Sequence, residues 1–365
     1  MIETLLNQFL LEEPVYRVAA PLDQVKQEYH LNEIYKLNSN ENPFGVSPKA
    51  VAAMQKAAAE VNFYPEGTGA ALRAKIGERL GIAPGQVMIT EGASVALNLI
   101  GEAFILPDDE VVEPAVTYGS YRGIIKRNGG VVVDVPMRED LGIDFSALLR
   151  AITPKTKLIF LCNPNNPTSI ACDPQELLDF LDAVPAHVVT IVDEAYIQFV
   201  DDPDYPSMVG QLADNKNLLV EQTLSKLYGM AGARVGYILS NAKIIKYLNR
   251  IANYFCTNKL ALAGAVAALD DTEFAAMTLR KSKEGRDYLT RALREMGFAP
   301  YPSSTNFRYG DCKKDPFALC EELKKQGYAI RGNFALTRIS IGTMAQNEGL
   351  IAAMKRVLPT LPPRE

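Results

Sequence analysis

The chain has 365 residues, of which 48% are hydrophobic and 22% are charged, so it can bury a large core and exceeds the usual size of one compact domain. We therefore expect two domains. The formal net charge is -5, and the lysines and arginines are scattered, so the sequence offers no basic stripe to neutralise a nucleic-acid backbone.

The N-terminal sequence MIETLLNQFLLEEPVYR carries acidic residues where a signal peptide needs a basic segment, and it lacks a small-residue cleavage site. The longest nearly uncharged stretch, residues 260–269, is about half of a membrane-spanning helix and indicates a buried helix instead. Five cysteines without a CxxC pair and two isolated histidines predict neither a disulfide framework nor a metal site. These features favour a cytoplasmic protein that binds no membrane, nucleic acid or metal.

Residues 1–36 show no long periodic pattern, and we expect an N-terminal arm that packs on the body of the protein. From about residue 86 to 240, short β-rich runs alternate with longer helical patterns, which is typical of a mainly parallel sheet covered by helices. The runs expected to form strands are QVMIT, EVVEP, GVVVDV, KLIFLC, VVTIVDE, NLLVEQ and RVGYIL. They predict an α/β fold with a seven-stranded sheet in a large domain over residues 37–240.

After Ser240 the pattern changes to helices, expected at 241–255 and 273–297, followed by short strand-like runs. These runs are NFRYG, YAIRG and TRISIGT. Helices followed by a few strands predict a smaller α+β domain over residues 241–365.

Polar segments follow four of the predicted strands, and ligands of open α/β sheets bind outside the carboxyl ends of strands. The segments are residues 91–94 (EGAS), 163–168 (NPNNPT), 193–196 (DEAY) and 223–226 (TLSK). The first leads into a helix whose exposed N–H groups and dipole can hold a phosphate. Each segment alone is explained more simply as a turn or a solvated pair. Together they supply a lysine, a carboxylate and a phosphate cradle, which are the groups that a pyridoxal cofactor needs.

Over nearly its whole length, the sequence resembles the fold-type I aminotransferases, and within them most closely the histidinol-phosphate aminotransferases. The resemblance rests on LNSNENPFG (37–45), NFYPEG (62–67), TEGAS (90–94), TYGSY (117–121), CNPNNPT (162–168), DEAY (193–196), TLSKLYGMAGARVGY (223–237) and TRISIGT (337–343). The lysine segment with its downstream arginine is the most specific of these motifs. The resemblance implies the fold-type I architecture, pyridoxal 5'-phosphate as cofactor, an amino donor and a 2-oxo acid acceptor.

The resemblance also implies roles at the cofactor ring. Lys226 would form the Schiff base and then carry a proton between the substrate Cα and the cofactor C4′. Asp193 would pair with the pyridinium nitrogen and keep it protonated. Asn166 and Tyr196 would hydrogen-bond the phenolic oxygen, and Tyr118 would stack on the ring.

The cofactor phosphate would be held by side chains and by the start of a helix. The residues implied are Ala93, Ser94, Thr223, Ser225 and Arg234. Tyr64 would reach in from a second subunit, so that the active site would be complete only in a homodimer. An ordinary packed aromatic beside Pro65 explains Tyr64 equally well.

Two arginines would bind the substrate. Arg338 would grip an α-carboxylate, or the equivalent end of histidinol phosphate, through its planar fork. A surface salt bridge is the alternative, but the apolar, strand-like run around Arg338 means that the charge needs a partner. Arg331 would contact a substrate phosphate or a distal acid.

The sequence does not decide which amino donor is the substrate, because the spacing between Arg331 and Arg338 is shorter than histidinol-phosphate aminotransferases usually show. Ser169 also stands where the family usually has glycine. Histidinol phosphate with 2-oxoglutarate is the leading pair. An aromatic or other amino donor, or decarboxylation of a phosphorylated threonine on the same scaffold, remains an alternative.

Two other classes of protein are disfavoured. GTGAAL at residues 67–72 lacks the third glycine of a dinucleotide fingerprint and follows NFYPE instead of a strand, so we reject a nicotinamide dehydrogenase. A ligand-sensing regulator would need an added basic DNA-binding segment, for which we find no room.

Overall fold

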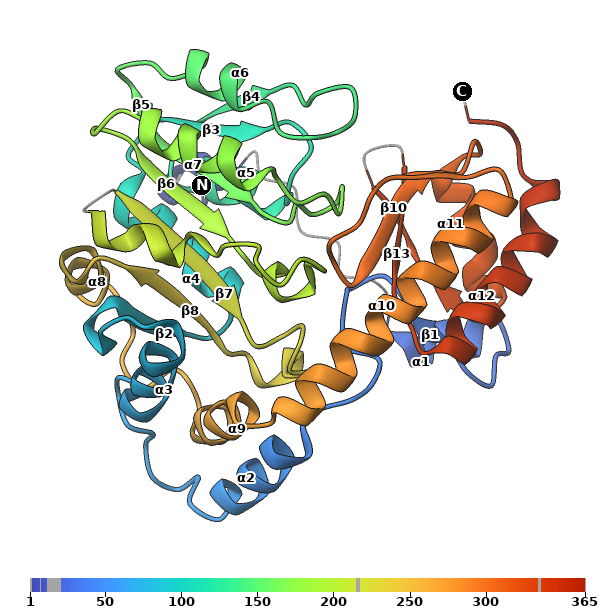
Figure 1. The fold of residues 1–365 in the computed structure, drawn as a ribbon, viewed down its shortest axis with the longest axis horizontal. Coiled ribbons are helices and arrows are strands. Elements are labelled where there is room, and N and C mark those ends of the chain that lie inside the picture. Colours follow the sequence, from blue (N-terminus) through green and yellow to red (C-terminus); the bar gives the residue numbers. More distant parts are fainter. Residues whose placement is uncertain (1, 7, 12–20, 215–216, 334–335, 365) are drawn as a thin grey trace.

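The structure is a computed structural model and describes the chain except residues 1, 7, 12–20, 215–216, 334–335 and 365. Its described residues form a large unit around one sheet and a small unit around another (Figure 1). The long helix α10 (Thr272–Glu295) runs from the first unit into the second.

The large unit is built on a seven-stranded sheet with the strand order β2-β8-β7-β6-β5-β3-β4. The strands are β2 (Val87–Thr90), β3 (Glu110–Pro114), β4 (Val131–Val135), β5 (Thr156–Cys162), β6 (Val189–Asp193), β7 (Leu218–Thr223) and β8 (Gly236–Ser240). Neighbouring strands run parallel except β8, which is antiparallel to β2 and β7. All seven runs predicted as strands between residues 86 and 240 contribute to this sheet, so the predicted mainly parallel α/β fold is confirmed.

Helices cover both faces of the sheet, and a hydrophobic core lies between each helical layer and the sheet, which explains why the strands are apolar almost throughout. On β7, Leu219 points into the core on one face, while Leu218 and Val220 point into the core on the other face. The first core packs under α4 (Ala93–Phe104), α5 (Ser120–Arg127) and α8 (Ala242–Leu248). The second packs under α2 (Pro48–Ala58), α3 (Ala70–Leu80), α6 (Phe145–Arg150), α7 (Pro174–Ala183) and α9 (Lys259–Leu269).

Two helices after residue 240 pack on the large sheet. The buried helix predicted at 260–269 is present as α9. The helix predicted at 241–255 ends at Leu248, so this prediction was wrong in length. Asn249 follows as the C-cap, and its backbone N–H still donates to the carbonyl of Ile245 at 3.0 Å. Beyond it the chain tightens into turns, in which Ile251 donates to Leu248 at 3.2 Å. The predicted domain limits are not settled by this packing and stay a prediction.

The small unit has an antiparallel sheet of order β12-β13-β10-β9. Its strands are β9 (Ala299–Pro300), β10 (Phe307–Asp311), β12 (Arg331–Asn333) and β13 (Leu336–Ser340), and its core is covered by α10, α11 (Pro316–Lys325) and α12 (Met344–Val357). Residues 334 and 335, in the predicted short loop between Arg331 and Arg338, lie outside the described residues.

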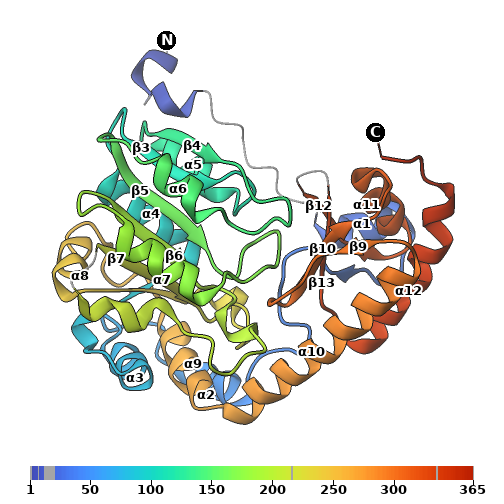
Figure 2. The same cartoon turned by 45° about the horizontal axis from the view of Figure 1, so that its top comes forward.

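The described parts of the predicted N-terminal arm touch both units. The short turns η1 (Glu3–Leu5) and η2 (Gln8–Leu10) precede the gap at 12–20, and Phe9 of η2 contacts Gly129 beyond α5. Helix α1 (Leu22–Glu28) and strand β1 (Tyr35–Lys36) follow, and β1 pairs in parallel with β11 (Tyr328–Ala329). Figure 2 shows the N-terminal turns above the large unit and α1 beside the small one.

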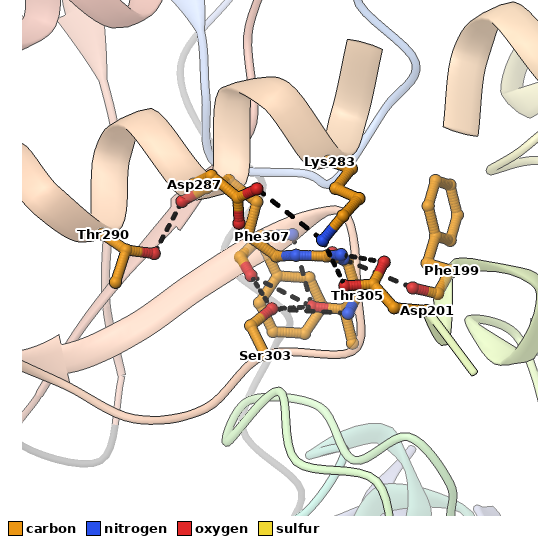
Figure 3. A network of polar contacts seen from close by, with 9 residues as sticks. Phe199, Asp201, Lys283, Asp287, Thr290, Ser303, Thr305 and Phe307 are labelled. Atoms are coloured by element: carbon orange, nitrogen blue, oxygen red, sulfur yellow. Dashed lines mark hydrogen bonds and ion pairs between the residues drawn. The ribbon is translucent and has the colours of Figure 1, made fainter. Parts of the chain in front are cut away.

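A polar network ties α10 to the large unit. The buried Arg286 donates to the backbone carbonyls of Phe199, at 3.3 Å, and Thr305, at 3.0 Å, and forms an ion pair with Asp201. Lys283, one turn earlier, reaches the other oxygen of Asp201 at 2.9 Å (Figure 3). This network fixes how the small unit faces the end of the large sheet. Among the described helices, none has the length and hydropathy that crossing a membrane requires.

Candidate active site

The candidate site lies at the carboxyl ends of β5, β6 and β7, where three polar residues stand abreast. Cys162, Asp193 and Glu221 are register partners on these adjacent parallel strands. Loops that leave the same ends carry residues 163–168 and 223–226, and β13 of the small unit contributes from the opposite side. The edge predicted from the sequence is therefore the place where the two units meet.

Lys226 sits at this edge and is half-buried. Its Nζ donates to the backbone carbonyl of Ser39 at 3.3 Å and lies 5.6 Å from the ring centroid of Tyr196. Burial, followed by the positive charge of Arg338, lowers the pKa of Lys226 to about 8. An amine with this pKa is partly neutral near neutral pH and can act as a nucleophile or a base.

Asp193 is a buried carboxyl held by two donors. The hydroxyl of Tyr121 donates to Oδ2 at 2.7 Å, and the backbone N–H of Ala195 donates to Oδ1 at 3.0 Å. Burial raises the pKa of Asp193, while these hydrogen bonds oppose the rise by stabilising the anion. Such a carboxyl gains from a positively charged partner in the site, as a protonated ring nitrogen would be.

Arg338 on β13 is buried and reaches the loop after β5. Its Nη1 donates to Oδ1 of Asn166 at 2.6 Å, and its Nη2 donates to the carbonyl of Asn38 at 2.7 Å. The buried Nε has no hydrogen-bond partner among the described residues. Burial, then the nearby charge of Arg331, lowers the pKa of Arg338. A buried guanidinium with a free donor is suited to an anionic ligand.

Aromatic side chains pack together at this edge of the sheet, and Tyr196 is the one that lies against the Lys226 amine. The hydroxyl of Tyr196 accepts a hydrogen bond from the side-chain amide of Asn40 at 3.0 Å, and burial raises its pKa. The Tyr196 ring also meets Phe307 of the small unit edge-on at 5.1 Å between centroids. Tyr118 packs edge-on against Tyr121 at 5.5 Å, half-buried at the start of α5.

An anion cradle forms at the N-terminus of α4. Gly92 precedes this helix with a φ of +88° and supplies no capping side chain, so the first N–H groups of Ala93 and Ser94 remain available. The guanidinium of Arg234 lies over Gly92, because a Cβ built there would be only 2.5 Å from Nη2. Helix dipole, free N–H groups and a guanidinium together favour a phosphate.

Thr223 and Ser225 form a linked pair of hydroxyls in the loop after β7. Their oxygens are 2.9 Å apart, and the backbone N–H of Ser225 donates to the Thr223 hydroxyl at 3.2 Å. Both are buried, and the Thr223 hydroxyl also lies 3.1 Å from the carbonyl of Val235, next to Arg234. Thr223 therefore orients Ser225, and the phosphate-binding role of both residues stays a prediction.

Two predicted site residues stand apart from this cluster. Arg331 is exposed on β12, opposite Arg338 in the strand register, and its charge acts on Arg338. Tyr64 is 83% exposed, and its ring meets Phe255 at 5.5 Å. The fold of one chain therefore does not bring Tyr64 to the cradle.

The sequence analysis missed four residues that the structure places at the site: Ser39, Asn40, Tyr121 and Glu221. Ser39 and Asn40 lie within LNSNENPFG, and Tyr121 closes TYGSY, so both motifs carried a signal that was not used residue by residue. Glu221 lay inside a predicted strand, where its charge was the available signal.

Ser169 occupies a position that glycine would adopt more easily. Its φ is +68°, and its hydroxyl donates to the carbonyl of Pro302 at 2.9 Å. The backbone N–H of Ser304 donates in return to the Ser169 carbonyl at 2.8 Å. The loop after β5 is thereby fastened to the small unit, and Asn166 keeps its place beside Arg338.

Pyridoxal phosphate fits this set of groups. The uncapped α4 terminus under Arg234 suits its phosphate, the buried Asp193 suits its ring nitrogen, and the Lys226 amine suits its aldehyde. Among the described residues, no group of three or more His, Cys, Asp or Glu could hold a metal ion.

Comparisons with known proteins agree with this geometry. The family described as aminotransferase class I and II matches residues 32–354. Histidinol-phosphate aminotransferase of Brevibacillus brevis is 37% identical over 359 residues, covering 96% of this chain and 98% of the relative. The Akkermansia muciniphila enzyme of the same name is 38% identical over 367 residues, covering 98% and 99%. The crystal structure of histidinol-phosphate aminotransferase from Sinorhizobium meliloti, in complex with pyridoxal-5'-phosphate, superimposes with a TM-score of 0.91 at 27% identity, covering 97% of this chain and 98% of that one.

Proposed function

The chain belongs to the class I and II aminotransferase family and is an aminotransferase, and from that premise we propose that it binds pyridoxal 5'-phosphate on Lys226. We further propose that it transfers the amino group of histidinol phosphate to 2-oxoglutarate. The observation that carries the proposal is the half-buried Lys226 at the carboxyl edge of the sheet, whose pKa is lowered to about 8 and whose charge interacts with the buried Asp193 and with Arg234 of the anion cradle.

The cofactor supplies an electron sink for the electron pair that remains when the substrate Cα loses its proton. Asp193 acts on the ring nitrogen, because a carboxylate in hydrogen-bond contact stabilises the protonated ring. Asn166 and Tyr196 act on the phenolic oxygen, and Tyr118 on the ring face. Ser225, Arg234 and the α4 N–H groups hold the phosphate.

Lys226 moves the proton during transamination. With the cofactor and substrate bound, the free Lys226 amine would take the proton from the substrate Cα and return it at the cofactor C4′. Its lowered pKa suits both steps, because it accepts and releases a proton near neutral pH. The aromatic and small-unit side chains around it limit water at the reacting atoms.

Histidinol phosphate as donor is supported by the names of the relatives and by two arginines on neighbouring strands. The buried Nε of Arg338 has no hydrogen-bond partner among the described residues, and Arg331 stands opposite it nearer to solvent. This pair can meet a phosphate monoester in the first half-reaction and the carboxylates of 2-oxoglutarate in the second. Another amino donor, or decarboxylation of a phosphorylated threonine, would use the same arginines.

We propose a homodimer in which Tyr64 reaches the cradle of the partner. Exposed apolar side chains gather beside the α4 terminus, where Val95, Tyr254 and Phe255 line a cavity of about 320 Å³. A surface of this kind suits a second copy of the chain. Sedimentation tests the dimer, and Tyr64→Phe should weaken cofactor binding if its hydroxyl reaches the phosphate.

A cytoplasmic location is also proposed. All five cysteines are free, which suits a reducing compartment.

A donor panel in single turnover tests the substrate. The protein loaded with pyridoxal phosphate is mixed in turn with histidinol phosphate, histidinol, phenylalanine and phosphothreonine, and formation of pyridoxamine phosphate and of carbon dioxide is measured. Complete amino transfer from histidinol phosphate, with slow transfer from unphosphorylated histidinol, supports the proposal. Faster transfer from phenylalanine, or carbon dioxide from phosphothreonine, would assign the site to one of the alternatives.

A further inference from the structure

A second buried carboxyl lies beside Asp193. Glu221 is 0% exposed near the end of β7 and is the register partner of Asp193 on β6. Side chains of partnered residues on parallel strands project to the same face of the sheet. Cys162 and Ile238, the next partners in this row, both belong to the core under α4, so Glu221 faces that core.

Neither carboxyl oxygen of Glu221 receives a hydrogen bond from an N–H or O–H donor among the described residues. Its carboxyl projects to the same face of the sheet as that of Asp193 on the adjacent strand, and the charges of the two groups interact. Two ionised carboxylates are both acceptors and repel each other, so this arrangement is favourable only with a proton between them.

The proton belongs on Glu221. Asp193 accepts from the Tyr121 hydroxyl and the Ala195 N–H, which stabilise its anion, whereas Glu221 has no such donors. Burial, followed by the charges of Asp193 and Glu194, raises the pKa of Glu221 well above its ordinary value, and the charge of Lys226 opposes this rise.

The thiol of Cys162 on β5, which lies in the same row on the same face, leaves this assignment unchanged. Burial raises the pKa of this thiol, so it is neutral near neutral pH and offers Glu221 no compensating positive charge.

We propose that Glu221 is a positioning residue that stays protonated and donates its O–H to Asp193, which holds Asp193 as an oriented anion for the cofactor nitrogen. A neutral acid provides a donor without adding a cation that would compete with the protonated ring. The role of Asp193 in this inference rests on the proposed function, whereas the shared proton does not.

Two variants separate this role from simple packing. Glu221→Gln keeps an N–H donor but cannot ionise, and Glu221→Leu has a similar size without a donor. Glu113→Gln serves as the control, because Glu113 is also a buried carboxyl but belongs to β3 beside Arg122. Thermal unfolding establishes that each protein is folded before it is compared.

The first readout is the infrared difference spectrum of the cofactor-free protein at neutral pH, wild type minus Glu221→Gln. We expect the carbonyl band of a protonated carboxylic acid in this difference. Its absence would contradict the proposal, whether or not the protein binds pyridoxal phosphate.

The second readout is the dissociation constant of pyridoxal phosphate. Glu221→Gln should bind within about threefold of wild type, while Glu221→Leu should bind about tenfold or more weakly, as loss of a hydrogen bond to a charged group predicts. Glu113→Gln should match wild type. Equal binding by the Gln and Leu variants would overturn the positioning role, whereas failure of the wild type to bind would overturn the proposed function instead.

Discussion

Arg338 donates a 2.6 Å hydrogen bond to the side-chain oxygen of Asn166, and this bond joins the small unit to the loop after β5. Its second contact, to the carbonyl of Asn38, leaves Nε buried and without a partner among the described residues. The guanidinium is therefore held in place with one donor still unused. An anionic substrate group would complete its coordination.

Replacing Arg338 with lysine should raise KM for the 2-oxo acid by about tenfold or more, because an ammonium cannot reproduce a fork that binds Asn166 and a substrate oxygen together. Steady-state kinetics with a varied acceptor measures this change. Arg356→Lys, on the exposed face of α12, is the matched control and should leave KM unchanged. An unchanged KM in Arg338→Lys would remove Arg338 from the substrate site.

Gly92→Ala should weaken binding of pyridoxal phosphate by about tenfold or more. The new methyl would lie 2.5 Å from Nη2 of Arg234, and the φ of +88° is unfavourable for alanine, so both the guanidinium and the start of α4 must shift. Gly210→Ala is the control, since its Cβ meets nothing within 4 Å. Fluorescence titration with the cofactor measures both affinities, and equal values would place the phosphate elsewhere.

Attachment of pyridoxal phosphate to Lys226 should accelerate as pH rises and level off above about 8. Burial lowers the pKa of this amine from 10.5 to about 8, so below that pH it is mostly protonated and cannot attack, while above it the neutral amine dominates. Stopped-flow absorbance across the pH range measures the rate. A rate that continues to rise toward pH 10.5 would show an unperturbed lysine.

Arg286→Leu should lower the free energy of unfolding by about 3 kcal/mol, because it leaves the carbonyls of Phe199 and Thr305 without this donor and breaks the ion pair with Asp201. Lys283→Leu, which removes the more exposed ion pair, should cost less than about 1 kcal/mol. Urea unfolding of both variants measures the difference. Equal losses would show that the network does not fasten α10.

Much of the fold was predictable because its strands are buried on both faces. Parallel strands between two helical layers become short apolar runs, and all seven runs form the sheet. The antiparallel insertion of β8 between β2 and β7 was not predicted, because it depends on the path of the chain and leaves no mark on the strand pattern. The end of α8 was missed because the chain tightens into turns after Leu248 while apolar residues continue beyond it.

The positions of Asp193 and Lys226 in the site were predictable, because each of these residues lies at or just after the carboxyl end of a predicted strand. Contacts between residues that are far apart in the sequence could not be predicted from the spacing of motifs along the chain. Asn40 meets Tyr196, and Arg338 meets Asn166, only because the small unit folds back on the large sheet. The predicted role of Arg338 is tested by the Arg338→Lys variant above.

Peptide mapping after borohydride reduction tests the central claim most directly. The protein is loaded with pyridoxal phosphate, reduced, digested and analysed by mass spectrometry, with Lys226→Ala treated in parallel. We predict one phosphopyridoxyl group per chain, on the peptide that contains Lys226, and none in the variant. Modification of a different lysine, or the same yield in Lys226→Ala, would contradict the assignment of Lys226 as the residue that carries the cofactor.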